Sequence, residues 1–151
     1  MNKDIMVTAT KNVHIKSMGN NFLITWKIIQ FSTRENQFQS EFYVLEDIKV
    51  HFVLYFLDND PKSYIQTTFY GLTSEICPKI DFEITNFQDK SKTFQNSQKA
   101  IFTPENHRHT FSFPISYNDI KTETNGFLQN NSDLTLTIKV FYKAPISMLS
   151  T

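Results

Sequence analysis

The sequence predicts an all-β domain, a sandwich or a barrel of about eight short antiparallel strands. Apolar and polar residues alternate along several segments, as expected of strands with one buried face. The chain holds 15 Phe and only 3 Gly, a composition that suits a packed β-protein better than an active site built from loops. No internal repeat, low-complexity tract or flexible linker divides the 151 residues, so we expect one domain.

The alternation is clearest in segments 22–28 and 134–140, where every second residue is large and apolar. Trp26 belongs to the first stripe, so we expect it in the core rather than stacked on a ligand. Segment 48–57 is apolar on both faces, which favours a central strand, and the turn formers Asp58-Asn59-Asp60-Pro61 end it. Ser116 is placed to cap one helical turn over 117–121. We expect the remaining strands at 38–45, 64–72, 80–87, 99–102 and 109–115.

Charge and cysteine content exclude several classes of function. Fifteen basic residues balance fifteen acidic ones, whereas nucleic-acid-binding proteins usually carry a basic excess. No segment approaches the roughly 18 apolar residues of a membrane helix, and the start of the chain does not read as a signal peptide. Cys77 is the only cysteine and cannot form an internal disulfide. We therefore expect no nucleic-acid or membrane partner, and a cytoplasmic or nuclear location.

Four segments, read in order, resemble strand motifs of meprin-and-TRAF-homology (MATH) domains, and the pattern is most similar to the speckle-type POZ subgroup. Phe22, Trp26, Ile28 and Phe31 resemble the aromatic residues and Ile of the opening strand, and Ser40-Glu41-Phe42 is similar to the Ser-x-Phe second strand. The segment Ile80-Asp81-Phe82-Glu83-Ile84-Thr85-Asn86 resembles the Phe-x-Phe-x-Ile-x-Asn strand. Asn125-Gly126-Phe127-Leu128 and Asp133-Leu134-Thr135-Leu136 resemble the family's ending.

The resemblance implies an eight-stranded antiparallel TRAF-like β-sandwich over residues 13–143, with an N-terminal extension 1–12 and a C-terminal tail 144–151. It also implies a shallow groove on one sheet that holds an extended segment of a partner protein. The speckle-type relatives are substrate adaptors of cullin-based ubiquitin ligases, which places this chain in a ubiquitin-ligase context. We see neither their BTB domain nor a coiled coil in the sequence, so we expect no ligase recruitment by this chain alone.

The groove is predicted where positions of this sequence match the family's groove. The family's Lys-Asp-Trp-Gly-Phe stretch reads His107-Arg108-His109-Thr110-Phe111, so a cation replaces an acid at Arg108. Arg108 is therefore predicted to pair with an acidic or phosphorylated residue of the partner. The full predicted set is Thr68, Tyr70, Ile80, Ile101, His107, Arg108, His109 and Phe111.

Motifs of catalysis and cofactor binding are absent from the sequence. It has no Gly-x-Ser-x-Gly elbow, no phosphate-cradling glycine loop and no His-Glu-x-x-His, so we expect neither an enzyme nor a bound cofactor. Cys77 could pair with a histidine as a nucleophile, but beside Pro78 a buried structural cysteine is expected. His107 and His109 would share a strand face but lack a third ligand, so no metal site is expected.

Two other functions compete with peptide recognition. The chain could be a permanent subunit that packs by a sheet face or edge in a larger complex, which predicts a large apolar interface. It could also be a carbohydrate-binding sandwich, because aromatic-rich sandwiches stack on sugars. The lone cysteine and the lack of a signal peptide count against an extracellular sugar-binding role.

Overall fold

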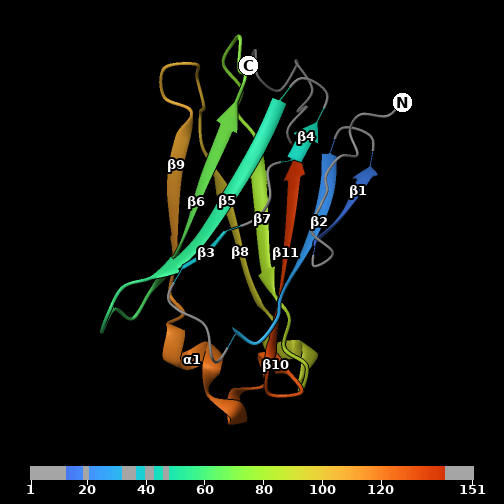
Figure 1. Ribbon diagram of the computed structural model, residues 1–151, viewed down its shortest axis with the longest axis vertical. Helices are drawn as coiled ribbons and strands as arrows, with labels where there is room; N and C mark the ends of the chain where they lie inside the picture. The colour runs from blue at the N-terminus through green and yellow to red at the C-terminus, as the bar shows by residue number, and fades with distance from the viewer. Residues whose placement is uncertain (1–12, 19–20, 32–36, 40–42, 46–47, 142–151) are drawn as a thin grey trace.

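The computed structural model describes residues 13–18, 21–31, 37–39, 43–45 and 48–141. These residues form two antiparallel sheets, one of six strands and one of five, whose strands run along the long axis of the molecule (Figure 1). The predicted all-β sandwich is therefore confirmed. It consists of eleven strand segments in the described part of the chain, rather than eight.

The six-stranded sheet, which we call sheet A, contains both ends of the described chain. Its strands follow the order β1-β2-β11-β7-β8, with β10 pairing to β11. Their bounds are β1 Val13–Met18, β2 Asn21–Ile28, β7 Lys79–Ile84, β8 Phe94–Lys99, β10 Leu128–Gln129 and β11 Asp133–Phe141.

The five-stranded sheet, sheet B, has the order β3-β5-β6-β9, and β4 also pairs with β5. Its bounds are β3 Gln37–Gln39, β4 Tyr43–Leu45, β5 Ile48–Phe56, β6 Ser63–Tyr70 and β9 Arg108–Phe113. As predicted, β5 lies inside its sheet. The predicted single strand over 38–45 appears as β3 and β4, and residues 40–42 lie outside the described residues.

One sequence prediction about strands is wrong, and one strand was missed. The strand expected at 99–102 lies earlier, as β8, and only Phe102 of the later segment pairs, in an isolated bridge with Ile76. The first strand, β1, had not been predicted at all. Segment 94–99 consists mainly of Gln, Asn and Ser, and as the edge strand of sheet A it needs no apolar stripe.

The core fills the space between the sheets with the apolar stripes that the sequence indicated. In β2 and β11 every second side chain is buried, and Trp26 is 5% exposed, as expected of a core residue. The ring of Phe82 in sheet A packs against Phe113 in sheet B with ring centroids 5.1 Å apart. Burying each such ring stabilises the fold by about 1.5–3 kcal/mol, so these stripes hold the two sheets together.

Short helical segments gather at one end of the sandwich, which we call the lower end (Figure 1). The helix α1 spans Tyr117–Lys121, and two 3-10 turns span Lys90–Lys92 (η3) and Glu123–Asn125 (η4). Ser116 caps α1 in a reciprocal capping box with Asp119, as its position predicted. In the described part of the chain, no helix has the length and apolar character needed to cross a bilayer.

A buried asparagine joins two segments at the lower end. Asn86 is 1% exposed; its Nδ2 donates to the Asn125 carbonyl oxygen at 2.8 Å, and its Oδ1 accepts from the backbone N–H groups of Gln88 and Asp89. Gly126 follows with φ of 85°, and a Cβ there would lie 2.6 Å from Asn86 Oδ1. Two motifs that carry the family resemblance therefore meet here, and the second needs its glycine because no side chain fits.

Candidate protein-binding site

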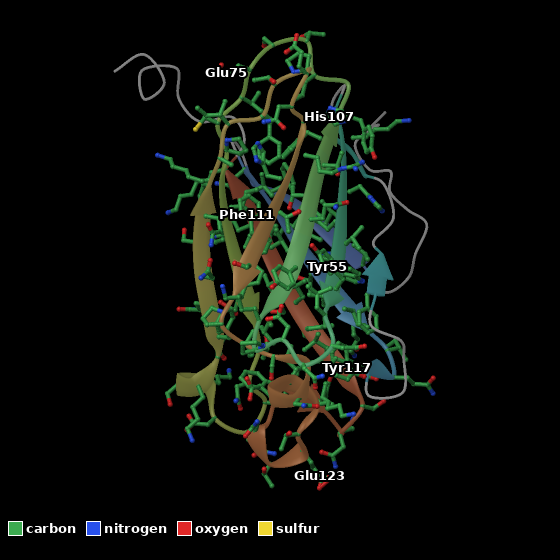
Figure 2. All side chains as sticks on the ribbon, turned by 90° about the vertical axis from the view of Figure 1, so that its left-hand side faces the viewer. Tyr55, Glu75, His107, Phe111, Tyr117 and Glu123 are labelled. Carbon is green, nitrogen blue, oxygen red and sulfur yellow. The ribbon has the colours of Figure 1, made fainter. Side chains whose placement is uncertain are left out.

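The predicted groove residues lie mainly at the upper end, opposite α1, where β6 ends and β9 begins. Figure 2 shows His107 at that end, Phe111 about half-way down β9, and Tyr117 and Glu123 toward the lower end. The register pairs Thr68 with Arg108, and the rings of Tyr70 and His107 lie 5.6 Å apart. Nε2 of His109 lies 2.6 Å from the Ile101 carbonyl oxygen.

Three of the predicted contact residues are buried, which corrects their expected role. Ile80 is fully buried and Phe111 is 7% exposed, because both belong to the inward stripes of their strands. The ring of Phe111 contacts Phe82 inside the core at 5.8 Å. Thr68 belongs to the outward positions of β6 but is only 1% exposed. None of these three side chains is open to a ligand in this structure.

The outer face of sheet B carries polar and charged side chains that lie side by side in rows across the strands. His51, Thr68 and Arg108 form one row across β5, β6 and β9, and Lys49 lies opposite Tyr70 in the next row toward the upper end. Strand residues alternate between the two faces, so Arg108 points away from the core whereas His109 points toward it. The side chains of His107, Arg108 and His109 therefore do not form one continuous surface, although all three belong to the predicted groove set.

Arg108 is an exposed cation of this face, and the Thr68 hydroxyl accepts a hydrogen bond from it. Arg108 Nε donates to Thr68 Oγ1 at 3.2 Å, which fixes one edge of the guanidinium and leaves the two terminal nitrogens directed away from that hydroxyl. Within the described residues, the only ion pair within 4.0 Å joins Lys79 to Asp81, on sheet A. Neither Arg108 nor Lys49 therefore has a carboxylate partner in the described part of the chain.

The register shows which backbone groups of β9 are unpaired. The N–H of Phe69 donates to the His107 carbonyl oxygen at 2.9 Å, so this is a hydrogen-bonded pair of the antiparallel ladder. Hydrogen-bonded and non-hydrogen-bonded pairs alternate along an antiparallel ladder. The pairs that Thr68, Gln66 and Tyr64 form with β9 are therefore non-hydrogen-bonded pairs. The backbone groups of those partners, Arg108, Thr110 and Ser112, point away from β6, toward the side of β9 where no further strand pairs in the described chain.

A stacked pair of tyrosines lies at the lower end of the same face. Tyr55 and Tyr64 stack with centroids 5.2 Å apart, and the Tyr64 hydroxyl donates to Asp60 Oδ2 at 2.6 Å. This hydrogen bond, with a second from the Lys62 backbone N–H, lowers the pKa of Asp60 below its ordinary value. The same bond raises the pKa of Tyr64. The carboxylate at this end thus already has donors of its own.

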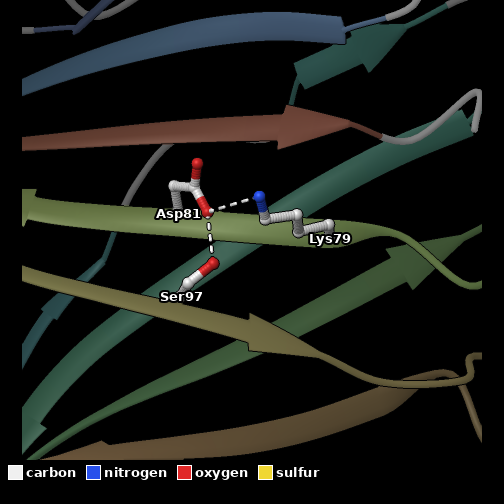
Figure 3. A network of polar contacts seen from close by, with 3 residues as sticks. All are labelled: Lys79, Asp81 and Ser97. Atoms are coloured by element: carbon white, nitrogen blue, oxygen red, sulfur yellow. Dashed lines mark hydrogen bonds and ion pairs between the residues drawn. The ribbon is translucent and has the colours of Figure 1, made fainter.

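Two shallow hollows lie elsewhere on the surface, and neither contains a predicted groove residue. One, of about 440 Å³, lies between the turn after β5 and the start of α1, near Leu57 and Tyr117. The other, of about 600 Å³, lies on the outer face of sheet A. Within it, Asp81 accepts from Ser97 Oγ at 2.5 Å and lies 4.0 Å from Lys79 Nζ (Figure 3).

Cys77 and His109, which the sequence offered as a possible nucleophile and a possible metal ligand, have structural surroundings. Cys77 is half-buried rather than buried, next to the buried Pro78. His109 packs edge-on against Phe102 with centroids 4.5 Å apart. In the part of the chain that the structure describes, no group of three or more His, Cys, Asp or Glu side chains is arranged to hold a metal ion.

Sequence reasoning missed the members of this surface that come from other strands. Lys49 and His51 join Arg108 only through the pairing of β5 with β6 and of β6 with β9. Thr110 and Ser112 alternate with the apolar Phe111 and Phe113 and were not among the predicted site residues. The signal that could have found them is the polar half of each alternating strand, since those positions face outward whenever the apolar half is buried.

No model of a known protein family matches this sequence, and no curated protein matches it either. The resemblance to MATH domains therefore remains a prediction that depends on the four motifs.

Proposed function

We propose that this protein is a protein-interaction module that binds an extended segment of a partner along the free edge of β9. The observation that carries the proposal is the set of unpaired backbone groups on Arg108, Thr110 and Ser112. An exposed strand edge of this kind is a template for an added strand, and β-augmentation is a common mode of peptide recognition. The MATH-like resemblance supports the same class of ligand.

An added strand would meet different surroundings on its two sides. Its outward side chains would lie beside Arg108, Thr110 and Ser112, all three of them exposed. Its inward side chains would approach the side of β9 that carries His109, near Ile101, which is 51% exposed. Specificity would come from these alternate side chains and affinity from the backbone bonds. An interface of this small size is expected to bind with a Kd of about 1 μM unless it is multivalent.

The distribution of exposed apolar residues favours this proposal over a permanent subunit. Obligate interfaces are large and apolar. Among the described residues, the large hydrophobic side chains that are clearly exposed are Leu57, Phe87 and Ile101, which belong to three separate loops. They form no continuous patch along either sheet.

The proposal includes the class of partner that the resemblance implies, a substrate of a ubiquitin ligase.

The test is to compare Thr110→Pro with Thr110→Val after selecting binders from a random peptide library on the full chain. Both variants lose the hydroxyl, but only proline removes the N–H at the free edge, and that N–H makes no bond to β6. We expect Thr110→Val to retain the selected peptides and Thr110→Pro to lose them, with both variants cooperatively folded. Equal binding by two folded variants would show that the edge of β9 is not the binding element.

A further inference from the structure

The charges on the two outer faces of the sandwich are arranged differently. On sheet A, Asp81 accepts from Ser97 and lies 4.0 Å from Lys79, and Glu83 accepts from Gln95. On sheet B, the described outward side chains of β5, β6 and β9 include the cations Lys49 and Arg108 and no carboxylate. Although the chain as a whole has a net charge of zero, these outward strand positions therefore carry a net positive charge.

We infer that this upper end recognises a phosphorylated serine or threonine in the bound partner segment; the inference rests on the proposed function. A residue of the added strand paired with Arg108 would project its side chain onto the outer face about 5 Å from Arg108. Arg108 is held through Nε by Thr68, so its two terminal nitrogens form a fork that can donate to two oxygens of one phosphate. Thr68 acts here as a positioning residue.

The charge and geometry of Arg108 favour a phosphate over a carboxylate. His51 and Arg108 are separated by one strand, which places their backbones about 10 Å apart, and Lys49 lies one row further toward the upper end. These distances exceed the screening length of about 8 Å at physiological salt, so Arg108 itself makes the main contribution. A phosphate carries about −1.5 to −2 charge against −1 for a carboxylate, so it gains more from a two-point contact with the Arg108 guanidinium.

The carboxylate at the lower end of this face does not compete. Asp60 lies beside Tyr64, and Tyr64 precedes Thr68 by four residues, which corresponds to about 13 Å along β6. The oxygens of Asp60 already accept from the Tyr64 hydroxyl and the Lys62 backbone N–H. Asp60 therefore does not occupy the Arg108 guanidinium.

The experiment measures binding of three matched peptide pools to the full chain. Each pool has the same randomised flanks around one fixed residue, which is phosphoserine, serine or glutamate. We expect the wild-type protein to bind the phosphoserine pool about tenfold or more tightly than the serine pool, with the glutamate pool between them. Arg108→Gln should remove most of this preference. Lys139→Gln, which removes a cation from the other sheet, should leave it unchanged.

The possible results separate this inference from the proposed function. If the wild type binds the serine pool as tightly as the phosphoserine pool, or if Arg108→Gln keeps the preference, phosphate recognition is wrong although peptide binding stands. If glutamate binds as tightly as phosphoserine, the site reads a carboxylate and the inference is again overturned. If no pool binds, the proposed function fails together with it. Thermal unfolding of each variant verifies that a loss of binding is not a loss of fold.

Discussion

The two ends of the sandwich differ in how their polar side chains are buried and hydrogen-bonded. At the lower end, the polar groups of Asn86 are buried and satisfied by backbone groups of two neighbouring segments, and Gly126 fits where no side chain would. At the upper end, Arg108 is exposed, and its side chain donates one hydrogen bond within the described chain, to the Thr68 hydroxyl. The contrast teaches that satisfied, buried polar groups fix the fold, whereas exposed charges without partners are available for binding.

The largest expected effect is at the lower end, in Gly126→Val. The left-handed φ of 85° and the 2.6 Å approach to Asn86 Oδ1 both oppose a β-branched side chain. We expect the free energy of unfolding to fall by roughly 3–5 kcal/mol. The matched control is Gly71→Val, which has a similar φ of 82° but is exposed. Urea unfolding of both variants measures the difference, and equal losses would contradict the role of close packing at Gly126.

A smaller loss is expected from Asn86→Ala, which removes the side chain that joins the two segments. The Asn125 carbonyl oxygen and the backbone N–H groups of Gln88 and Asp89 lose their partner in these partly buried hydrogen bonds. We expect a loss of about 2–3 kcal/mol in the free energy of unfolding. The control is Asn118→Ala on the exposed face of α1, where a change within about 0.5 kcal/mol is expected. Asn86 would not be the junction we describe if its loss were equally small.

At the upper end, Thr68→Val should affect binding more than stability. The substitution removes the hydroxyl that accepts from Arg108 Nε but keeps the shape of the buried side chain. We expect the free energy of unfolding to change by about 0.5–1.5 kcal/mol, while the preference for the phosphoserine pool falls because the guanidinium is no longer held. Thr110→Val, on the same face, serves as the control. An unchanged preference would show that Thr68 does not position Arg108.

The smallest effect is a pH dependence from the pair Asp60 and Tyr64. The hydrogen bond from Tyr64 lowers the pKa of Asp60 in the folded protein, so its stabilisation is present above the unfolded value of about 3.9 and is lost as the pH falls through the folded value. The raised pKa of Tyr64 gives stabilisation that is present below about pH 10 and lost as the pH rises through its folded value. Asp60→Asn should flatten the acid side of a plot of unfolding free energy against pH. An acid limb unchanged by this substitution would contradict the pairing.

The fold could be predicted from the sequence because burial of apolar side chains, its largest stabilising term, follows the two-residue period of a β-strand. The stripes of β2 and β11 are unbroken, so both strands and their buried faces were predicted correctly. Strand β8 escaped prediction because Phe94 is its only large apolar residue, and tertiary pairing at the sheet edge decides its structure. Strand β1 pairs only with β2 and was missed in the same way.

The site could be predicted only in part. The prediction did not use the two-residue alternation of the strands to separate inward from outward positions. Ile80 and Phe111 alternate with polar residues and share a stripe with other buried residues, so their strand patterns already assigned them to the core. Arg108 was found because its charge differs from the family pattern. The row that joins it to Thr68 and His51 depends on the register between three strands, which a single sequence does not specify.

The most direct test of the central claim is an NMR titration of the ¹⁵N-labelled full chain with a peptide selected from the library. The account predicts that backbone amide shifts change most at Arg108, Thr110 and Ser112 and little around Asp81 on the outer face of sheet A. Largest changes around Asp81 and Ser97, with β9 unaffected, would contradict the claim that the free edge of β9 binds the partner.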